Sequence, residues 1–170
     1  MNLKLEKINI NYLEKLKVVV KEYNEYNEDY EGAFFIKNIN ENKIKELENA
    51  SNGILDNPNF VPYTCYVVID ENKEIVGVAS IRHYLNDFLN KYGGHIGYSI
   101  LPTKRNNGYG TKTLKLLLEI AKNMDMKKIL ITCKNANYAS RKVIENNNGI
   151  FENEVIYNDD VLMRYRINLD

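Results

Sequence analysis

The sequence predicts a single α/β domain with a mixed, mostly antiparallel twisted sheet, a central parallel strand pair and flanking helices. Two pairs of β-rich runs are each joined by a short polar turn, as in antiparallel hairpins. Between these hairpins, a strand, an amphipathic helix and another strand follow in close succession, which indicates a parallel pair with a right-handed crossover. The length of 170 residues fits one domain over residues 1–170.

The N-terminal part of the chain is mainly helical in pattern. A short first strand is expected over residues 3–8. Apolar residues then recur at helical spacing and predict a helix over residues 11–29, with Asn11 as its N-cap. A second helix is expected over residues 41–49, followed by a loop at residues 51–62 that contains glycine and two prolines.

The pattern then changes to β. Apolar β-rich runs at residues 63–69 and 75–81 flank a polar turn and predict a hairpin. A strand over residues 95–101 ends at a proline, and an apolar stripe predicts a helix over residues 111–123.

The C-terminal third supplies the remaining elements. The apolar run at residues 128–133 is typical of a strand buried on both faces. A helix is expected over residues 137–146, and a last hairpin over residues 151–156 and 161–167.

The composition is that of an ordinary globular domain. It is 44% hydrophobic and 27% charged, and its 23 basic residues equal its 23 acidic residues, so the net charge is zero. Zero net charge provides no field for nucleic acid or anionic membranes, so neither is an expected partner. No apolar run is long enough to span a membrane, and the first residues lack the apolar core of a signal peptide. A cytoplasmic location is therefore expected.

The cysteines and histidines do not form a recognisable metal or disulfide pattern. Cys65 and Cys133 each lie in an apolar run and are expected to be buried free thiols. His83 and His95 are not at zinc-ligand spacing with them, so no metal site is expected.

The stretch HIGYSILPTKRNNGYGT, residues 95–111, carries the main chemical signal. A loop containing Gly108 and Gly110 leads directly into a strong helix whose first turn has no acidic residue. Unpaired N–H groups and the helix dipole favour an anion at such an end, and glycine lets a phosphate approach the backbone. A tight structural turn is the alternative. The pattern is neither a P-loop nor a Rossmann fingerprint.

Two motifs resemble one known family. The R-x-x-G-x-G run at residues 105–110 lies between a strand and an amphipathic helix, and NYASRKVIE follows at residues 137–145. In this order and spacing they resemble the GNAT acetyltransferase superfamily, closest to the branch that contains ribosomal-protein N-terminal acetyltransferases. The resemblance implies a GNAT-like fold and an acetyl-CoA-dependent N-acetyltransferase, an acyltransferase that acetylates a primary amine of a small molecule or peptide by direct attack.

The resemblance also implies positions for acetyl-CoA, the co-substrate. The pantetheine arm would pair with strand backbone, and an N–H near Leu101 would stabilise the oxyanion. The diphosphate would lie on the glycine loop, and the second motif would contact the arm and the phosphates. The residues implied are Ser99, Ile100, Leu101, Arg105, Asn106, Asn107, Gly108, Tyr109, Gly110, Thr111, Asn137, Ser140 and Lys142.

The catalytic groups are less clearly indicated by the sequence. His95, Tyr98 and Ser140 are the candidates, because they lie in or beside the two motifs. Many family members carry a tyrosine seven residues after the position of Asn137 that protonates the leaving thiolate, whereas this chain has Ile144.

Several alternatives remain open at the level of sequence. Ile144 favours, as a second hypothesis, a non-catalytic acyl-CoA-binding regulatory module. A generic nucleotide-binding α/β domain is a third hypothesis. Glu22, Glu25 and Glu28 line the acceptor site or form a solvated face, and the aromatic residues between 23 and 35 cover a substrate or pack in the core. The resemblance further implies a homodimer.

Overall fold

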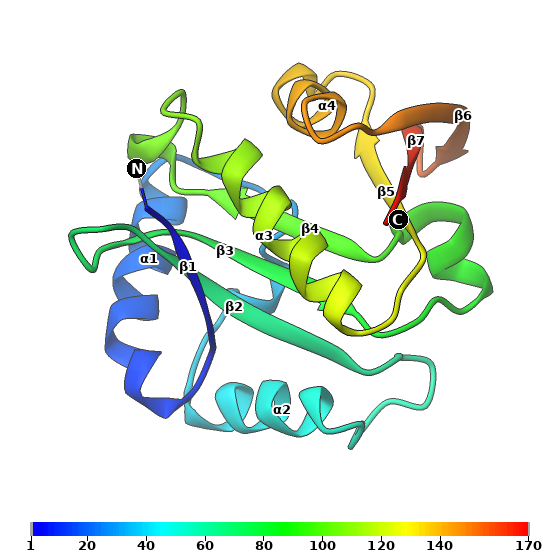
Figure 1. Cartoon of the computed structure of the whole chain (residues 1–170). Coiled ribbons are helices and arrows are strands. Elements are labelled where there is room, and N and C mark those ends of the chain that lie inside the picture. Colours follow the sequence, from blue (N-terminus) through cyan, green and yellow to red (C-terminus); the bar gives the residue numbers. More distant parts are fainter. Residues whose placement is uncertain (1, 170) are drawn as a thin grey trace.

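A computed structural model of the chain describes residues 2–169. Its strands form two antiparallel sheets (Figure 1). The larger sheet has the order β1-β2-β3-β4, and the smaller has the order β5-β7-β6. The strands are β1 (Lys4–Lys7), β2 (Tyr63–Ile69), β3 (Ile75–Arg82), β4 (Ile96–Ile100), β5 (Lys128–Lys134), β6 (Ile150–Tyr157) and β7 (Asp160–Asn168).

Helices cover both faces of the larger sheet (Figure 1). Alternate residues of β2 face opposite sides, so Cys65 and Val67 pack with α1 and α2, while Tyr66 and Val68 pack in the core that contains α3. The core that contains α3 continues into the smaller sheet and α4. The helices are α1 (Leu13–Glu25), α2 (Glu41–Ser51), α3 (Tyr109–Asn123) and α4 (Tyr138–Glu145).

The two sheets touch at one point and then diverge. The N–H of His95, which precedes β4, donates to the carbonyl of Leu130 in β5 at 2.8 Å, and Gly94 forms an isolated bridge with Ile131. Beyond this contact, β4 and β5 are in separate sheets. The expected central strand pair is therefore splayed, and this splay gives access to the edge of β4.

The element pattern expected from the sequence is confirmed, with two differences. The helix expected over residues 11–29 is a 3-10 turn (Ile10–Tyr12) followed by α1, which ends at Glu25. The predicted N-cap, Asn11, is wrong: the side chain of Asn9 accepts the N–H of Asn11 instead, at 3.0 Å. Asn27 adopts φ 53°, a left-handed conformation that prevents the helix from continuing.

The second difference is a π-helical turn, η3 (Leu89–Gly93), which no pattern in the sequence predicted. A cluster of aromatic rings supports it: the ring centroids of Tyr92 and Tyr157 lie 4.7 Å apart, and Phe88 contacts both rings. Tyr157 belongs to β6, so this turn depends on a tertiary contact that local sequence cannot show.

Both cysteines are buried and free, as expected. Among residues 2–169, no helix combines the length and apolarity needed to cross a membrane.

Candidate active site

A cavity of about 570 Å³ opens beside the edge of β4, between the loop that precedes α3 and the first turn of α4. The residues implied by the family resemblance line it, with two exceptions. Leu101 is buried beneath the sheet, and Asn107 uses its Nδ2 to donate to the carbonyls of Lys104 and Arg105. These two residues shape the site but do not border the cavity.

The first residues of α3 border this cavity, so the backbone N–H groups at the N-terminus of the helix are close to it. Gly108 is the N-cap with φ 77°, a conformation that glycine adopts without strain and that offers no side chain to cap the helix. Tyr109, Gly110 and Thr111 form the first helical turn and line the cavity. Their N–H groups precede the first intrahelical bond, in which Lys112 donates to Gly108. Such a set of donors suits a phosphate group.

Gly110 has a different role from Gly108. A Cβ on Gly110 would lie 3.2 Å from Cγ2 of Val143 in α4 and 3.8 Å from Cγ1 of Ile100 in β4. The absence of a side chain therefore lets α3 pack closely against α4 and β4. Two lysines also line the cavity: Lys104, which pairs with Glu74 at 2.6 Å, and Lys142.

The β3–β4 register decides which backbone groups of β4 are free. Leu101 donates its N–H to Val76 at 3.0 Å, and Ser99 faces Val78 in the register. Because hydrogen-bonded residues alternate along an antiparallel strand, Ser99 and Leu101 bond to β3, whereas Tyr98 and Ile100 direct their N–H and C=O groups away from it. The N–H of Leu101 is already bonded, so an oxyanion donor near Leu101 would have to be the N–H of Tyr98 or Ile100. On this edge, the carbonyl of Ile100 accepts from Nε of Arg105 at 3.1 Å, and the carbonyl of Tyr98 lies against Gly32. The N–H groups of Tyr98 and Ile100 are the groups that this edge offers to a ligand.

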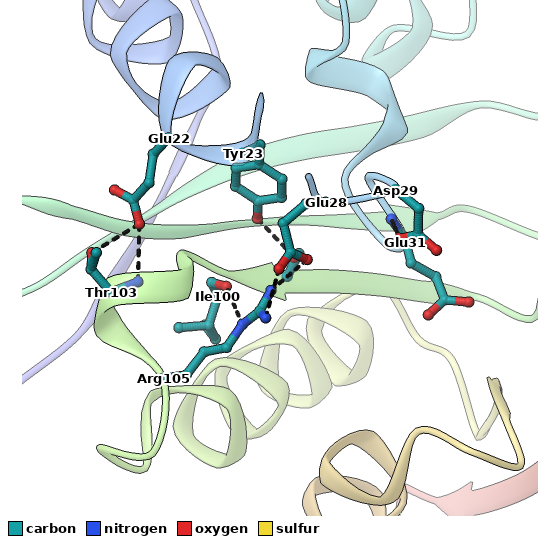
Figure 2. A network of polar contacts seen from close by, with 9 residues as sticks. Glu22, Tyr23, Glu28, Asp29, Glu31, Ile100, Thr103 and Arg105 are labelled. Carbon is teal, nitrogen blue, oxygen red and sulfur yellow. Dashed lines mark hydrogen bonds and ion pairs between the residues drawn. The ribbon is translucent and has the colours of Figure 1, made fainter. Parts of the chain in front are cut away.

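Arg105 is held in place by contacts within the protein (Figure 2). Its guanidinium forms a bidentate pair with Glu28, with N···O distances of 2.8 and 2.7 Å, and its Nε donates to the carbonyl of Ile100 at 3.1 Å. The pair and its hydrogen bonds raise the pKa of Arg105. The Glu28 carboxylate therefore lines the same cavity in which the family resemblance implies a diphosphate.

Two further contacts join the α1 region to the same loop (Figure 2). Glu22 accepts hydrogen bonds from the backbone N–H and the hydroxyl of Thr103, and the hydroxyl of Tyr23 donates to Oγ of Ser99 at 2.7 Å. Glu22 and Glu28 therefore support the cavity wall rather than forming a solvated face. Because they lie over 70 residues from their partners, no local pattern in the sequence could have indicated these contacts.

Tyr98 and Ser140 meet inside the cavity. Their hydroxyl oxygens are 3.1 Å apart, and both residues line the site. Burial raises the pKa of Tyr98, so its hydroxyl remains protonated at neutral pH. Asn137 holds Ser140 in place, because its Oδ1 accepts the Ser140 N–H at 3.0 Å and caps α4.

His95 occupies a different position. Its Nδ1 accepts the backbone N–H of Leu130 at 3.0 Å, and its side chain does not line the cavity. Burial is the main cause that lowers the pKa of His95 to about 4, and the nearby Arg166 and Arg82 lower it further. The geometry gives His95 a part in joining β4 to β5, and it favours Tyr98 and Ser140 over His95 as groups near the reacting atoms.

Ile144 also lies away from the cavity. It is completely buried in the core beneath α4 and contacts α3 and the smaller sheet. The position therefore contributes to packing, and the hydroxyl that the sequence lacks there is available in the cavity from Tyr98.

Two more cavities extend from the first. A second, of about 230 Å³, lies between the diverging strands and shares Glu31, Tyr98, Asn137 and Ser140 with the first cavity. A third, of about 820 Å³, shares Phe34, Ser80 and Arg82 with the second. The second cavity therefore shares lining residues with each of the other two.

Comparison with known proteins assigns this architecture. A protein-family model described as "Acetyltransferase (GNAT) domain" matches residues 18–149 of the chain. No curated protein matches the chain in sequence.

Solved structures are similar over nearly the whole chain. A ribosomal L7/L12 α-N-protein acetyltransferase, RimL, in complex with coenzyme A is 18% identical with a TM-score of 0.73, covering 100% of this chain and 96% of that one. A Vibrio cholerae spermidine N-acetyltransferase in complex with CoA and spermine is 15% identical with a TM-score of 0.69, covering 98% and 95%. The putative acetyltransferase yncA from Salmonella typhimurium, with acetyl-CoA, is 14% identical with a TM-score of 0.67, covering 99% and 94%. At these identities the likeness shows the fold.

Proposed function

The chain belongs to the GNAT acetyltransferase family and is an acetyl-CoA-dependent N-acetyltransferase, and we propose that its amine acceptor attacks the thioester directly beside Tyr98. One observation carries this proposal. The free edge of β4, the N-terminus of α3 and the Tyr98–Ser140 pair all border the same cavity. This combination offers a pairing edge for an amide-containing arm, donors for a diphosphate and a neutral acid near the thioester.

The residues of the cavity fit acetyl-CoA in order along its length. The N–H groups of Tyr109, Gly110 and Thr111, with Lys104 and Lys142 nearby, would hold the diphosphate. The N–H groups of Tyr98 and Ile100 would donate to carbonyl groups of the pantetheine arm along this edge of β4. Asn137 caps α4 with its Oδ1, which leaves its Nδ2 to donate to the arm.

The reaction then needs few groups from the protein. The neutral amine nitrogen forms a bond to the carbonyl carbon, and the free N–H of Tyr98 or Ile100 stabilises the negative charge that develops on the oxygen. As the C–S bond breaks, the Tyr98 hydroxyl donates its proton to the sulfur, and Ser140 bonds to the tyrosine oxygen. The proton lost from the nitrogen returns through water to the Tyr98 oxygen, so the tyrosine is regenerated and the products are the N-acetylated amine and the free thiol.

Positioning supplies much of the rate. Two bound reactants held in a productive geometry can lower the barrier by up to ~7–11 kcal/mol. This is consistent with a site in which no histidine or carboxylate contacts the Tyr98–Ser140 pair in the described residues.

The experiment is calorimetric titration of acetyl-CoA together with release of CoA thiol in the presence of amines. Gly108→Asp should abolish micromolar binding, because it places a carboxylate at the α3 N-cap. Gly53→Asp is the matched control, since Gly53 also has a positive φ of 80° but lies away from the cavities. No binding to the folded wild-type chain would contradict the proposal. Binding without thiol release by any amine would favour the non-catalytic acyl-CoA-binding module.

The acceptor is not fixed by the neighbours. The acceptors of the proteins with similar structures range from the N-terminal serine of a ribosomal protein to spermidine. A homodimer and a cytoplasmic location stay predictions.

A further inference from the structure

Arg82 is a partly buried cation at the junction of the second and third cavities. It ends β3 and lines both cavities together with Phe34 and Ser80. Its Nη1 donates to the carbonyl oxygens of Gly94 at 3.0 Å and Gly93 at 3.5 Å. These bonds fix one edge of the guanidinium against the η3 turn, and the other edge remains for a ligand.

No carboxylate pairs with Arg82 anywhere in residues 2–169. The more deeply buried Arg164 bonds to Glu152 at 3.0 Å and to Asn153 and Asn90. Arg105 pairs with Glu28. Burial lowers the pKa of Arg82, because no anion stabilises its charge as it leaves water. An unpaired buried charge destabilises a protein unless a partner binds it.

The other charges of the second cavity already have partners. Lys134 lies 3.2 Å from Asp160, 3.4 Å from Glu31 and 3.9 Å from Asp29, so this cation is paired with carboxylates. Asp87 lines the third cavity but forms no ion pair with Arg82 within the described chain. Of the two cations that line the second and third cavities, Arg82 is therefore the one without a carboxylate partner among the residues that the structure describes.

Aromatic side chains surround the far side of Arg82. The third cavity is bordered by Phe34, Phe60, Tyr84 and Phe88, each at least half exposed in this structure. Exposed aromatic groups that line one cavity are suited to an apolar or aromatic ligand.

The cavity order sets the direction in which an acceptor would lie. The second cavity borders Tyr98 and Ser140 at one end and Arg82 at the other. An amine placed beside Tyr98 therefore has the rest of its molecule directed toward Arg82 and the aromatic cavity.

We propose that the acceptor is an amine that also carries a carboxylate and an apolar or aromatic group, with the carboxylate bound by Arg82 and the apolar group in the third cavity. This inference rests on the proposed acetyl transfer. It excludes polyamines as good acceptors, because a second ammonium group would face the charge of Arg82.

The test compares amines that differ in a carboxylate. The pairs are L-phenylalanine against phenethylamine, and 4-(aminomethyl)benzoate against 4-methylbenzylamine, with spermidine as a polycation. The carboxylate member should have at least ~10-fold higher kcat/KM in one or both pairs, measured by thiol release at saturating acetyl-CoA. Arg82→Gln, which keeps an amide donor for the Gly94 carbonyl but removes the charge, should abolish that preference. Arg82→Lys should restore part of it.

Acetyl-CoA affinity separates this inference from the proposed function. Arg82 does not line the first cavity, so both variants should bind acetyl-CoA as the wild type does. An equal or higher kcat/KM for the amines without a carboxylate, or for spermidine, would overturn the inference. The proposed acetyltransferase activity would still stand.

If none of the five amines is acetylated, binding decides. Millimolar 4-methylbenzoate should then bind the acetyl-CoA complex of the wild type and not that of Arg82→Gln. No binding to either protein, or equal binding to both, would overturn the inference.

Discussion

The first cavity and the acceptor side differ in what builds them. The first uses backbone: the N-terminal amides of α3 and the free edge of β4, all within residues 98–111. The acceptor side uses side chains from distant segments, among them Phe34, Phe60, Arg82 and Phe88. A site made of backbone can keep one ligand while its side chains vary, whereas a site made of side chains changes specificity with each substitution.

One loop joins the two regions. Residues 28–32 follow α1 and place Glu28 in the first cavity and Gly32 in the second, with Glu31 in both. The predictions below test whether the two regions respond separately, as their construction suggests, or together through this loop.

The largest effect is expected at Gly32, where the loop meets β4. Gly32 has φ 75°, and a Cβ there would lie 2.3 Å from the carbonyl oxygen of Tyr98. Gly32→Ala should lower the free energy of unfolding by ~3 kcal/mol, from backbone strain and a clash with main-chain atoms. Urea denaturation measures this loss. Gly53→Ala is the control, since its φ is 80° but its Cβ would meet only Cγ of Pro62, at an ordinary contact distance of 4.0 Å, so ~1 kcal/mol is expected. Equal losses would show that the contact with β4 is unimportant.

Tyr98→Phe should separate chemistry from cofactor binding. Removing the proton donor should lower kcat about 100-fold, equivalent to ~2.7 kcal/mol, with little change in acetyl-CoA affinity. Steady-state thiol release and calorimetry measure the two quantities. Ser140→Ala removes the hydrogen-bond partner but not the acid, and should have a smaller effect on kcat. An unchanged kcat in Tyr98→Phe would remove Tyr98 from the mechanism.

His95 tests the point where the two sheets meet. Its pKa is about 4 in the folded chain against an ordinary value of 6.5, so between these values the unfolded chain binds more protons. The stabilisation from neutral His95 is therefore complete above pH 6.5 and is lost as the pH falls to about 4. Allowing for solvent screening of this partly exposed group, the loss is ~2 kcal/mol.

The measurement is urea denaturation at pH 7.5 and 4.5 for the wild type and His95→Asn. Asparagine can accept the Leu130 N–H but does not titrate. The fall in stability between the two pH values should be smaller in His95→Asn. An equal fall would assign the pH dependence to other groups.

The smallest effect is expected at the Glu28–Arg105 pair, which connects the joining loop to the first cavity. Arg105→Ala should weaken acetyl-CoA binding by ~10-fold, because it leaves the Glu28 carboxylate unpaired beside the diphosphate site. Adding Glu28→Gln should restore affinity to within ~3-fold of the wild type. Calorimetry of the four proteins in this cycle gives the result. Failure of Glu28→Gln to restore binding would mean that Arg105 contacts the cofactor directly.

The sequence by itself determined the order of elements, the fold class and the position of the glycine loop that we propose binds the diphosphate. These depend on local patterns: apolar periodicity, glycines before an uncapped helix and the two motifs at residues 105–110 and 137–145. Local patterns also placed Tyr98 and Ser140 among the candidates, and the structure brings both into one cavity.

The tertiary structure alone decided which backbone groups are free, what holds Arg105 and where the acceptor side lies. The β3–β4 register uses the N–H of Leu101, so this group is not available to a ligand. Glu28 pairs with Arg105, a residue 77 positions away in the sequence. Arg82 and Phe34 border the same cavities only because β3 and the loop after α1 pack side by side. Strand register and contacts between distant segments follow from packing of the whole chain, so no window of sequence contains them.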